Sequence, residues 1–199
     1  MARSCNFDRQ DKLIAAMELF WQKGYADTSV ADLVAHLKIN RFSLYNSFGD
    51  KLSLYREALG YYLAHYAQPR ITPLLADDAD LQSIIDYIQA FVALQAEQPY
   101  GCFMQNAVLE KYLSDEVVQQ LCSELFYGLH EAFARVLTDE QRLGRVNSEV
   151  NPQEVASFLV MQLQGIRVLG KAKQYALIEQ ARRVLTGYLD GLFLRAITD

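Results

Sequence analysis

The sequence lacks the long apolar stretches and leader segments of membrane and secreted proteins. Hydrophobic residues make up 51% of the chain, yet no run of 18 or more apolar residues occurs, so no membrane span is expected. The N-terminal stretch MARSCNFDRQDK is polar and does not resemble a secretory signal. Only three cysteines are present, an odd number, which favours reduced thiols over a disulfide framework. We therefore expect a cytoplasmic protein with no membrane partner.

Patterns for catalysis and for cofactors are also missing. No glycine-rich phosphate loop occurs. The three histidines, His36, His65 and His130, lie far apart on different predicted helices, and none has a second ligand four residues on. Aspartate and glutamate fall on helix faces that read as solvated. The sequence therefore predicts no enzyme, no metal site and no cofactor.

What the sequence does contain is apolar residues at helical spacing, which predicts an all-α protein of about nine helices. Pro69 is expected to stop the fourth helix and to begin a loop up to Asp80. Ser114 is expected to cap the long helix that follows it. The expected helices are residues 11–23, 30–37, 41–47, 51–68, 81–97, 103–112, 115–137 with an extension to 142, 152–173 and 174–196.

The net charge of −5 is unevenly distributed along the chain. Residues 1–56 carry 8 basic and 6 acidic side chains, whereas residues 57–199 carry 11 basic and 18 acidic ones. An acidic body with a slightly basic head fits a protein that touches DNA with one end only.

Residues 28–51, TSVADLVAHLKINRFSLYNSFGDK, have the form of two short helices joined by a tight turn. Ser29 and Asp32 form an S-x-x-D capping box, and Asn40 can cap the second helix. This is the helix-turn-helix pattern, whose second helix enters the major groove of DNA.

The same stretch resembles the DNA-binding signature of the TetR family of bacterial transcriptional regulators. The resemblance is carried by Leu44, Tyr45, Phe48 and Lys51 and by the A-x-x-L-F-x-x-x-G-Y ending of the first helix, and it covers roughly the first 60 residues. It implies a three-helix DNA-binding head, residues 1–56, and a helical-bundle body for ligand binding and dimerisation, residues 57–199. It also implies a repressor that binds palindromic double-stranded operators. A small-molecule inducer or thiol modification would release the repressor from the DNA.

Five residues of the second short helix are predicted to face the groove, because Leu44 and Phe48 point inward: Arg41, Phe42, Ser43, Tyr45 and Asn46. Arginine can bond guanine and asparagine can bond adenine, each with about 1–3 kcal/mol of discrimination. Phe42 departs from the small or charged residues common at this family position. It either touches a thymine methyl or marks an unusual operator.

Phosphate contacts follow from the resemblance alone. Thr28, Tyr45 and Lys51 match family positions that contact phosphate, and the start of the first helix would bring Arg9 or Lys12 near the DNA backbone. Such contacts position a protein without reading sequence. Taken singly, Tyr45 can equally be a packing residue and Arg41 a solvated charge.

Cys102 lies in the segment GCFMQNAVLE, which resembles a segment of one TetR subgroup. It falls where a helix is expected to start, and a helix N-terminus lowers the pKa of a thiol. Cys102 is therefore either a redox sensor or a small buried hydrophobic residue.

An inducer pocket is predicted between body helices, lined by aromatic residues that suit a planar or apolar ligand. The same side chains would serve equally well as core. The candidates are Tyr62, Tyr66, Phe91, Phe103, Met104, Tyr112, Phe126, Tyr127 and His130.

The last two helices carry apolar stripes that look wider than one core contact needs, which predicts a homodimer with two-fold symmetry. The predicted interface residues are Phe158, Gln162, Ile166, Leu185, Tyr188, Leu189 and Leu192. Two heads about 34–36 Å apart can read a palindrome. The alternative function is a helical protein-interaction module that keeps the head without reading DNA.

Overall fold

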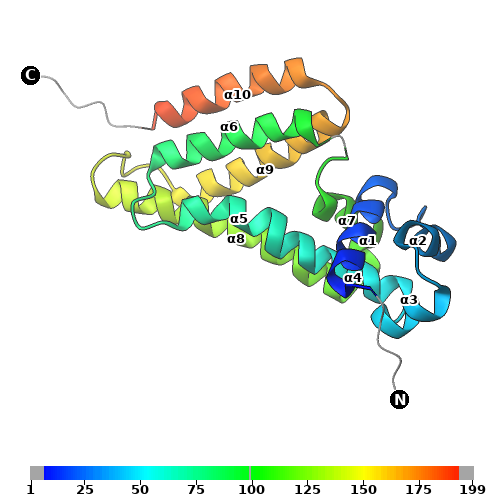
Figure 1. Cartoon of the computed structure of the whole chain (residues 1–199). Coiled ribbons are helices and arrows are strands. Elements are labelled where there is room, and N and C mark those ends of the chain that lie inside the picture. Colours follow the sequence, from blue (N-terminus) through cyan, green and yellow to red (C-terminus); the bar gives the residue numbers. More distant parts are fainter. Residues whose placement is uncertain (1–6, 99, 193–199) are drawn as a thin grey trace, which may run out of the picture. The chain divides into compact units, whose positions relative to one another are not determined.

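The computed structural model describes residues 7–98 and 100–192, and within these ranges the chain is helical without a β-strand (Figure 1). The predicted all-α class is confirmed. No helix in the described ranges is both long and apolar enough to cross a membrane. The helices are α1 Arg9–Lys23, α2 Val30–Leu37, α3 Arg41–Phe48, α4 Lys51–Tyr62, α5 Gln68–Ile71, α6 Leu81–Glu97, α7 Phe103–Lys111, α8 Glu116–Arg142, α9 Pro152–Lys171 and α10 Tyr175–Asp190.

The helices group into two compact units. The first unit takes in residues 1–67 and 102–123, and the second takes in residues 68–101 and 124–199. The first unit therefore combines α1 to α4 with α7 and the start of α8. The expected boundary at residue 56 instead assigns α7 and α8 to the body. Helix α8 begins in the first unit and continues in the second.

Aromatic side chains explain why α7 belongs with the head. The Tyr55 ring meets Phe20 of α1 edge-on at 5.1 Å between centroids, and it meets Phe103 of α7 in the same way at 5.5 Å. All three side chains are almost completely buried. Edge-to-face pairs of this kind add about 0.5–1.5 kcal/mol each to the free energy of burial.

The segment around Pro69 differs from the prediction of a helix end followed by a loop. A π-helical turn, Leu63–Ala67, follows α4, and Pro69 lies inside the short helix α5 before a 3-10 turn, Thr72–Leu75. A π turn shifts the backbone hydrogen bonds by one residue, so the helix can continue past a proline that lacks an N–H. The expected stop at Pro69 is therefore wrong.

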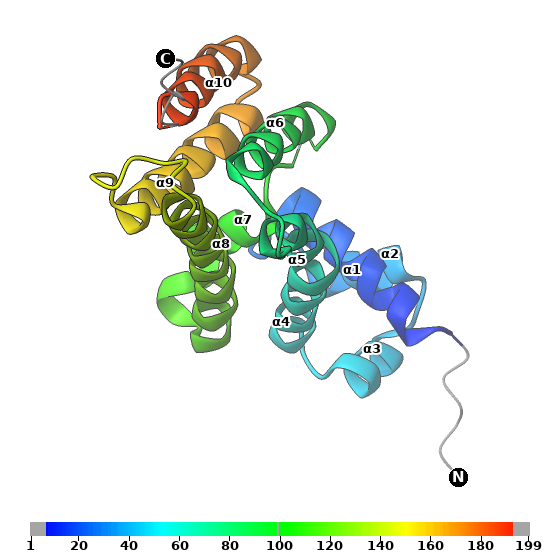
Figure 2. The ribbon, with the colours of Figure 1, turned by 90° about the vertical axis from the view of Figure 1, so that its left-hand side faces the viewer.

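In the second unit, α6, α9 and α10 lie side by side and pack against one another (Figure 2). Gly170 of α9 lies so close to α6 that a Cβ there would come within 2.8 Å of the Gln95 side chain. A residue other than glycine would push the two helices apart. The predicted last helix is confirmed from Tyr175 to Asp190, and residues 193–196 of that prediction lie outside the described residues.

Candidate DNA-binding surface

Both helices of the predicted helix-turn-helix begin at side-chain caps. The Asp32 N–H donates to the Ser29 hydroxyl at 3.0 Å, and the Ser29 N–H donates to the Asp32 carboxylate at 2.8 Å. Asn40 accepts from the Ser43 N–H at 2.8 Å. The predicted capping box and the predicted Asn40 cap are confirmed. Hydrogen bonds from Ser29, and then from Lys23, lower the pKa of Asp32 to about 2.

Helix α3 divides its residues between a buried side and an exposed side. Leu44 and Phe48 are buried, as predicted, and Ser43 is half-buried. Four of the predicted groove-facing side chains are exposed: Arg41, Phe42, Tyr45 and Asn46. The Arg41 guanidinium lies 5.9 Å from the centre of the Tyr45 ring. These four residues form one outward surface, which we call the α3 face.

The three predicted phosphate contacts have different surroundings. Tyr45 is exposed on the α3 face. Lys51 is half-buried, with its Nζ 4.2 Å from the centre of the Tyr25 ring, and burial lowers its pKa. Thr28 is 0% exposed and its hydroxyl donates to the Gly24 carbonyl at 2.6 Å. Its side chain holds the α1–α2 turn together, so this geometry gives no support to the phosphate contact expected of Thr28.

The Arg9 side chain is also bonded within the chain. Its guanidinium donates to the Glu57 carboxylate at 2.7 Å and to the Ser47 carbonyl at 3.1 Å, and it lies over the Phe48 ring. These contacts hold the start of α1 against the end of α3 and against α4, so Arg9 acts as a brace for α3.

The turn after α1 is held by Glu110 of α7, which the sequence reasoning missed. The Tyr25 and Ala26 N–H groups donate to Glu110 Oε2 at 2.6 and 3.2 Å. Gly24, with a φ of 85°, leaves room for this carboxylate, since a Cβ there would lie 2.6 Å from Glu110 Oε1. Lys51 and Lys111 both lie over the Tyr25 ring, at 4.2 and 4.9 Å from its centre.

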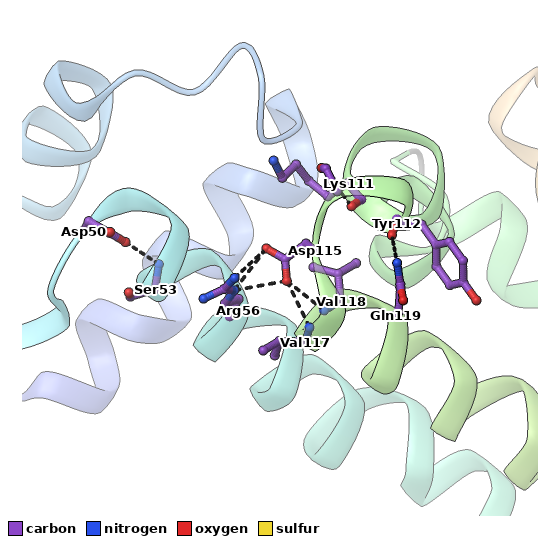
Figure 3. A network of polar contacts seen from close by, with 10 residues as sticks. Asp50, Ser53, Arg56, Lys111, Tyr112, Asp115, Val117, Val118 and Gln119 are labelled. Atoms are coloured by element: carbon purple, nitrogen blue, oxygen red, sulfur yellow. Dashed lines mark hydrogen bonds and ion pairs between the residues drawn. The ribbon is translucent and has the colours of Figure 1, made fainter.

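A second contact joins α4 to the start of α8 (Figure 3). Arg56 Nε donates to both oxygens of Asp115 at 3.1 and 3.0 Å, and its Nη2 lies 3.0 Å from Oδ2. The Val117 and Val118 N–H groups donate to the same carboxylate. Burial opposes its ionisation, but the Arg56 and Val118 hydrogen bonds outweigh burial and lower the pKa of Asp115. Asp115 rather than the predicted Ser114 therefore caps α8.

Cys102 immediately precedes α7, as predicted, and is 4% exposed. Its sulfur accepts from the Tyr62 hydroxyl at 3.7 Å. Cys122 of α8 is also buried, and its thiol donates to the Met104 carbonyl at 3.7 Å. Burial, with a further contribution from Cys102, raises the pKa of Cys122 to about 12. Both thiols therefore flank the first turn of α7.

The nine predicted pocket residues are divided between the two units. Tyr62, Tyr66, Phe103, Met104 and Tyr112 belong to the first unit, and Phe91, Phe126, Tyr127 and His130 belong to the second. A cavity of about 570 Å³ in the second unit is lined by Phe91 and by none of the other eight. Its other lining residues are Arg70, Pro73, Ser83, Asp86, Tyr87, Ala90, Ala93, Leu94 and Glu97.

Four of the seven predicted interface residues of α9 and α10 are buried in this chain's own core. Ile166, Leu185, Leu189 and Leu192 are buried, and Gln162 is half-buried. Phe158 and Tyr188 are exposed, and their rings meet edge-on at 5.7 Å. Four further apolar residues of these helices, which the prediction did not name, are more exposed: Met161, Val168, Leu177 and Val184.

Comparisons with known proteins agree with this geometry. Residues 13–58 match the family described as bacterial regulatory proteins, tetR family. The transcriptional repressor ComR of Escherichia coli (strain K12) is 29% identical over 183 residues, which are 89% of this chain and 85% of ComR. The HTH-type transcriptional regulator YezE of Bacillus subtilis (strain 168) is 31% identical over 151 residues, which are 75% of this chain and 78% of YezE.

Solved structures add the DNA-bound state of a relative. A cysteine mutant of the TetR family transcriptional regulator CifR, in complex with 26-bp double-strand operator DNA, superposes with a TM-score of 0.76 at 29% identity. The match covers 91% of this chain and 98% of CifR. The chain therefore belongs to the TetR family of bacterial transcriptional regulators.

Proposed function

We propose that this regulator represses transcription in the cytoplasm by binding a palindromic operator through α3. The observation that carries the proposal is the α3 face, where Arg41 and Asn46 are exposed above two buried anchors. Arg41 suits guanine and Asn46 suits adenine in the major groove. Tyr45 and Lys51 supply phosphate contacts, which set the register on the duplex. CifR, which resembles this chain over nearly its whole length, has been solved with operator DNA.

The operator-binding form is a homodimer built on α9 and α10. The exposed apolar residues of the two helices recur at helical spacing, and water-exposed stripes of this kind are typical of protein contacts. They include Phe158, Met161 and Val168 on α9 and Leu177, Val184 and Tyr188 on α10. A two-fold axis would pair each stripe with its copy and present two α3 faces to one palindrome.

Release from DNA would act through α7 and α8, because both helices contact the head. Glu110 holds the α1–α2 turn and Asp115 holds Arg56 of α4. A ligand in the 570 Å³ cavity, whose Tyr87 and Phe91 rings suit a planar or apolar molecule, is one source of the signal. Modification of Cys102, which would require its burial against Tyr62 to open, is the other. Either one must favour the form that cannot bind DNA.

Selection of the purified protein on random duplexes tests the proposal, run with and without a mild electrophile. Enrichment of a palindrome is expected, with two chains bound per duplex by sedimentation. Loss of binding on treatment that is absent in Cys102→Ser would assign the signal to the thiol. If a palindrome is enriched and the electrophile does not change its binding, a ligand in the cavity would be the remaining source of the signal. No enrichment at low salt would contradict operator binding and favour the protein-interaction module.

A further inference from the structure

Phe42 is an apolar side chain that the fold itself does not use. It is the second residue of α3 and is 79% exposed, whereas Leu44 and Phe48 supply the buried contacts of the same helix. Within the described residues no ring or cation is paired with it, although Tyr45 beside it lies under Arg41. Packing within this chain therefore gives no reason for a phenylalanine at this position.

The surroundings of Phe42 favour nucleic acid over an apolar protein partner. Lys38 and Arg41 precede it, Asn46 follows one turn later on the same side of α3, and all three are exposed. An exposed apolar ring within four residues of two cations and an amide complements a polyanion that carries a small apolar feature. An apolar protein surface would leave those charges desolvated and unpaired.

We infer that Phe42 reads the 5-methyl group of one thymine in each half of the operator. In the major groove the apolar mark of a base pair is this methyl group, and phenylalanine is among the side chains that contact it. Residues in the first turn of a recognition helix are those that reach base edges. Phe42 has this role only if α3 binds operator DNA, so it rests on the proposed function.

The test deletes the methyl group from the DNA and the ring from the protein. Each symmetric thymine pair of the selected operator is replaced by deoxyuridine, and the dissociation constant is measured at one fixed salt concentration. Burial of one methyl-sized group changes affinity by about fourfold. Because a palindrome presents it twice, one symmetric pair should weaken binding by roughly 15-fold.

The ring is then removed with Phe42→Ala, which should bind the thymine and deoxyuridine operators equally. Leu109→Ala is the matched control, because Leu109 is also apolar and 79% exposed but lies on α7. This control should keep the full deoxyuridine penalty. With cytosine at the identified position, 5-methylation should recover about fourfold per half-site for the native protein and nothing for Phe42→Ala.

Three results would overturn the assignment. Deoxyuridine without effect at every thymine would mean that no methyl group is read. A deoxyuridine penalty that persists in Phe42→Ala would assign the methyl to another residue. If Phe42→Ala lowers the affinity for the thymine and deoxyuridine operators equally, the ring contacts the sugar or inserts between base pairs instead. Failure to enrich any operator would instead refute the proposed function, and this role with it.

Discussion

Two short helices of the first unit, α3 and α7, are nearly equal in length and opposite in use. Helix α3 buries Leu44 and Phe48 and leaves its remaining large side chains in water. Helix α7 buries Phe103, Met104 and Ala107, and its Glu110 is bonded to the head. The Arg41 and Asn46 side chains of α3 are exposed to an external partner, whereas the Glu110 carboxylate of α7 is bonded within the first unit.

Because of this difference, we expect operator affinity and the stability of the fold to depend on different residues. Substitutions on the α3 face should change operator affinity and leave the fold intact, because those side chains make few contacts within the chain. Substitutions at the contacts of α7 and α8 with the head should change stability first, and operator affinity only as a consequence.

The largest effect on stability is expected from Arg56→Ala, which leaves the fully buried Asp115 carboxylate without its cation. Breaking a buried ion pair on one side should lower the free energy of unfolding by about 3 kcal/mol. Urea denaturation measures it. Arg142→Ala removes an arginine whose side chain is 75% exposed and should cost less than about 0.5 kcal/mol. A loss below about 1 kcal/mol for Arg56→Ala would show that the Val117 and Val118 N–H groups suffice.

Arg41→Ala is the counterpart on the α3 face. It should weaken operator binding by about 1–3 kcal/mol per half-site, because a guanine would lose its bidentate partner. The midpoint of urea denaturation should stay unchanged. Binding is compared at matched salt with Arg142→Ala, which removes the same charge from α8 and should bind as the native protein does. Unchanged affinity in Arg41→Ala would remove this residue from the proposed contacts.

Glu110→Ala should have an intermediate effect on stability. The Tyr25 and Ala26 N–H groups would exchange a carboxylate for water, which costs about 1–2 kcal/mol of unfolding free energy. Hydrogen exchange of those two amides should accelerate, since they lose their acceptor. Glu116→Ala removes an exposed glutamate at the start of α8 and is the control. It should leave the exchange of both amides unchanged and lower the free energy of unfolding by less than about 1 kcal/mol, the contribution of an acidic residue in the first turn of a helix. Unaltered exchange at Tyr25 and Ala26 would contradict the clamp.

The sequence was sufficient for most of the structural features that depend on neighbours in the chain. The Ser29–Asp32 box, the Asn40 cap and the inward anchors of α3 follow from spacings of three or four residues. The all-α class follows from the same periodicity. Helix ends at Pro69 and Ser114 were wrong, because a π turn accommodates the proline and a buried aspartate caps α8 better than a neighbouring serine.

Contacts between distant residues could not be predicted. Glu110 and Tyr25 are 85 residues apart, and a glutamate near the end of a helix gives no local sign that it binds a backbone turn. The same holds for Arg56 and Asp115, 59 residues apart. Burial of Thr28 also depends on tertiary packing, since a threonine before a helix usually reads as an exposed cap.

The smallest effect is expected from Asp32→Asn, through the pH dependence of stability. The folded-state pKa of Asp32 is about 2, below the usual value of an aspartate. The stabilisation from the ionised form is therefore complete above about pH 4 and is lost as the pH falls towards 2. Thermal unfolding from pH 2 to 6 should show a shallower acid limb in Asp32→Asn than in the native protein. Identical acid limbs would mean that Ser29 and Lys23 do not stabilise the ionised carboxylate.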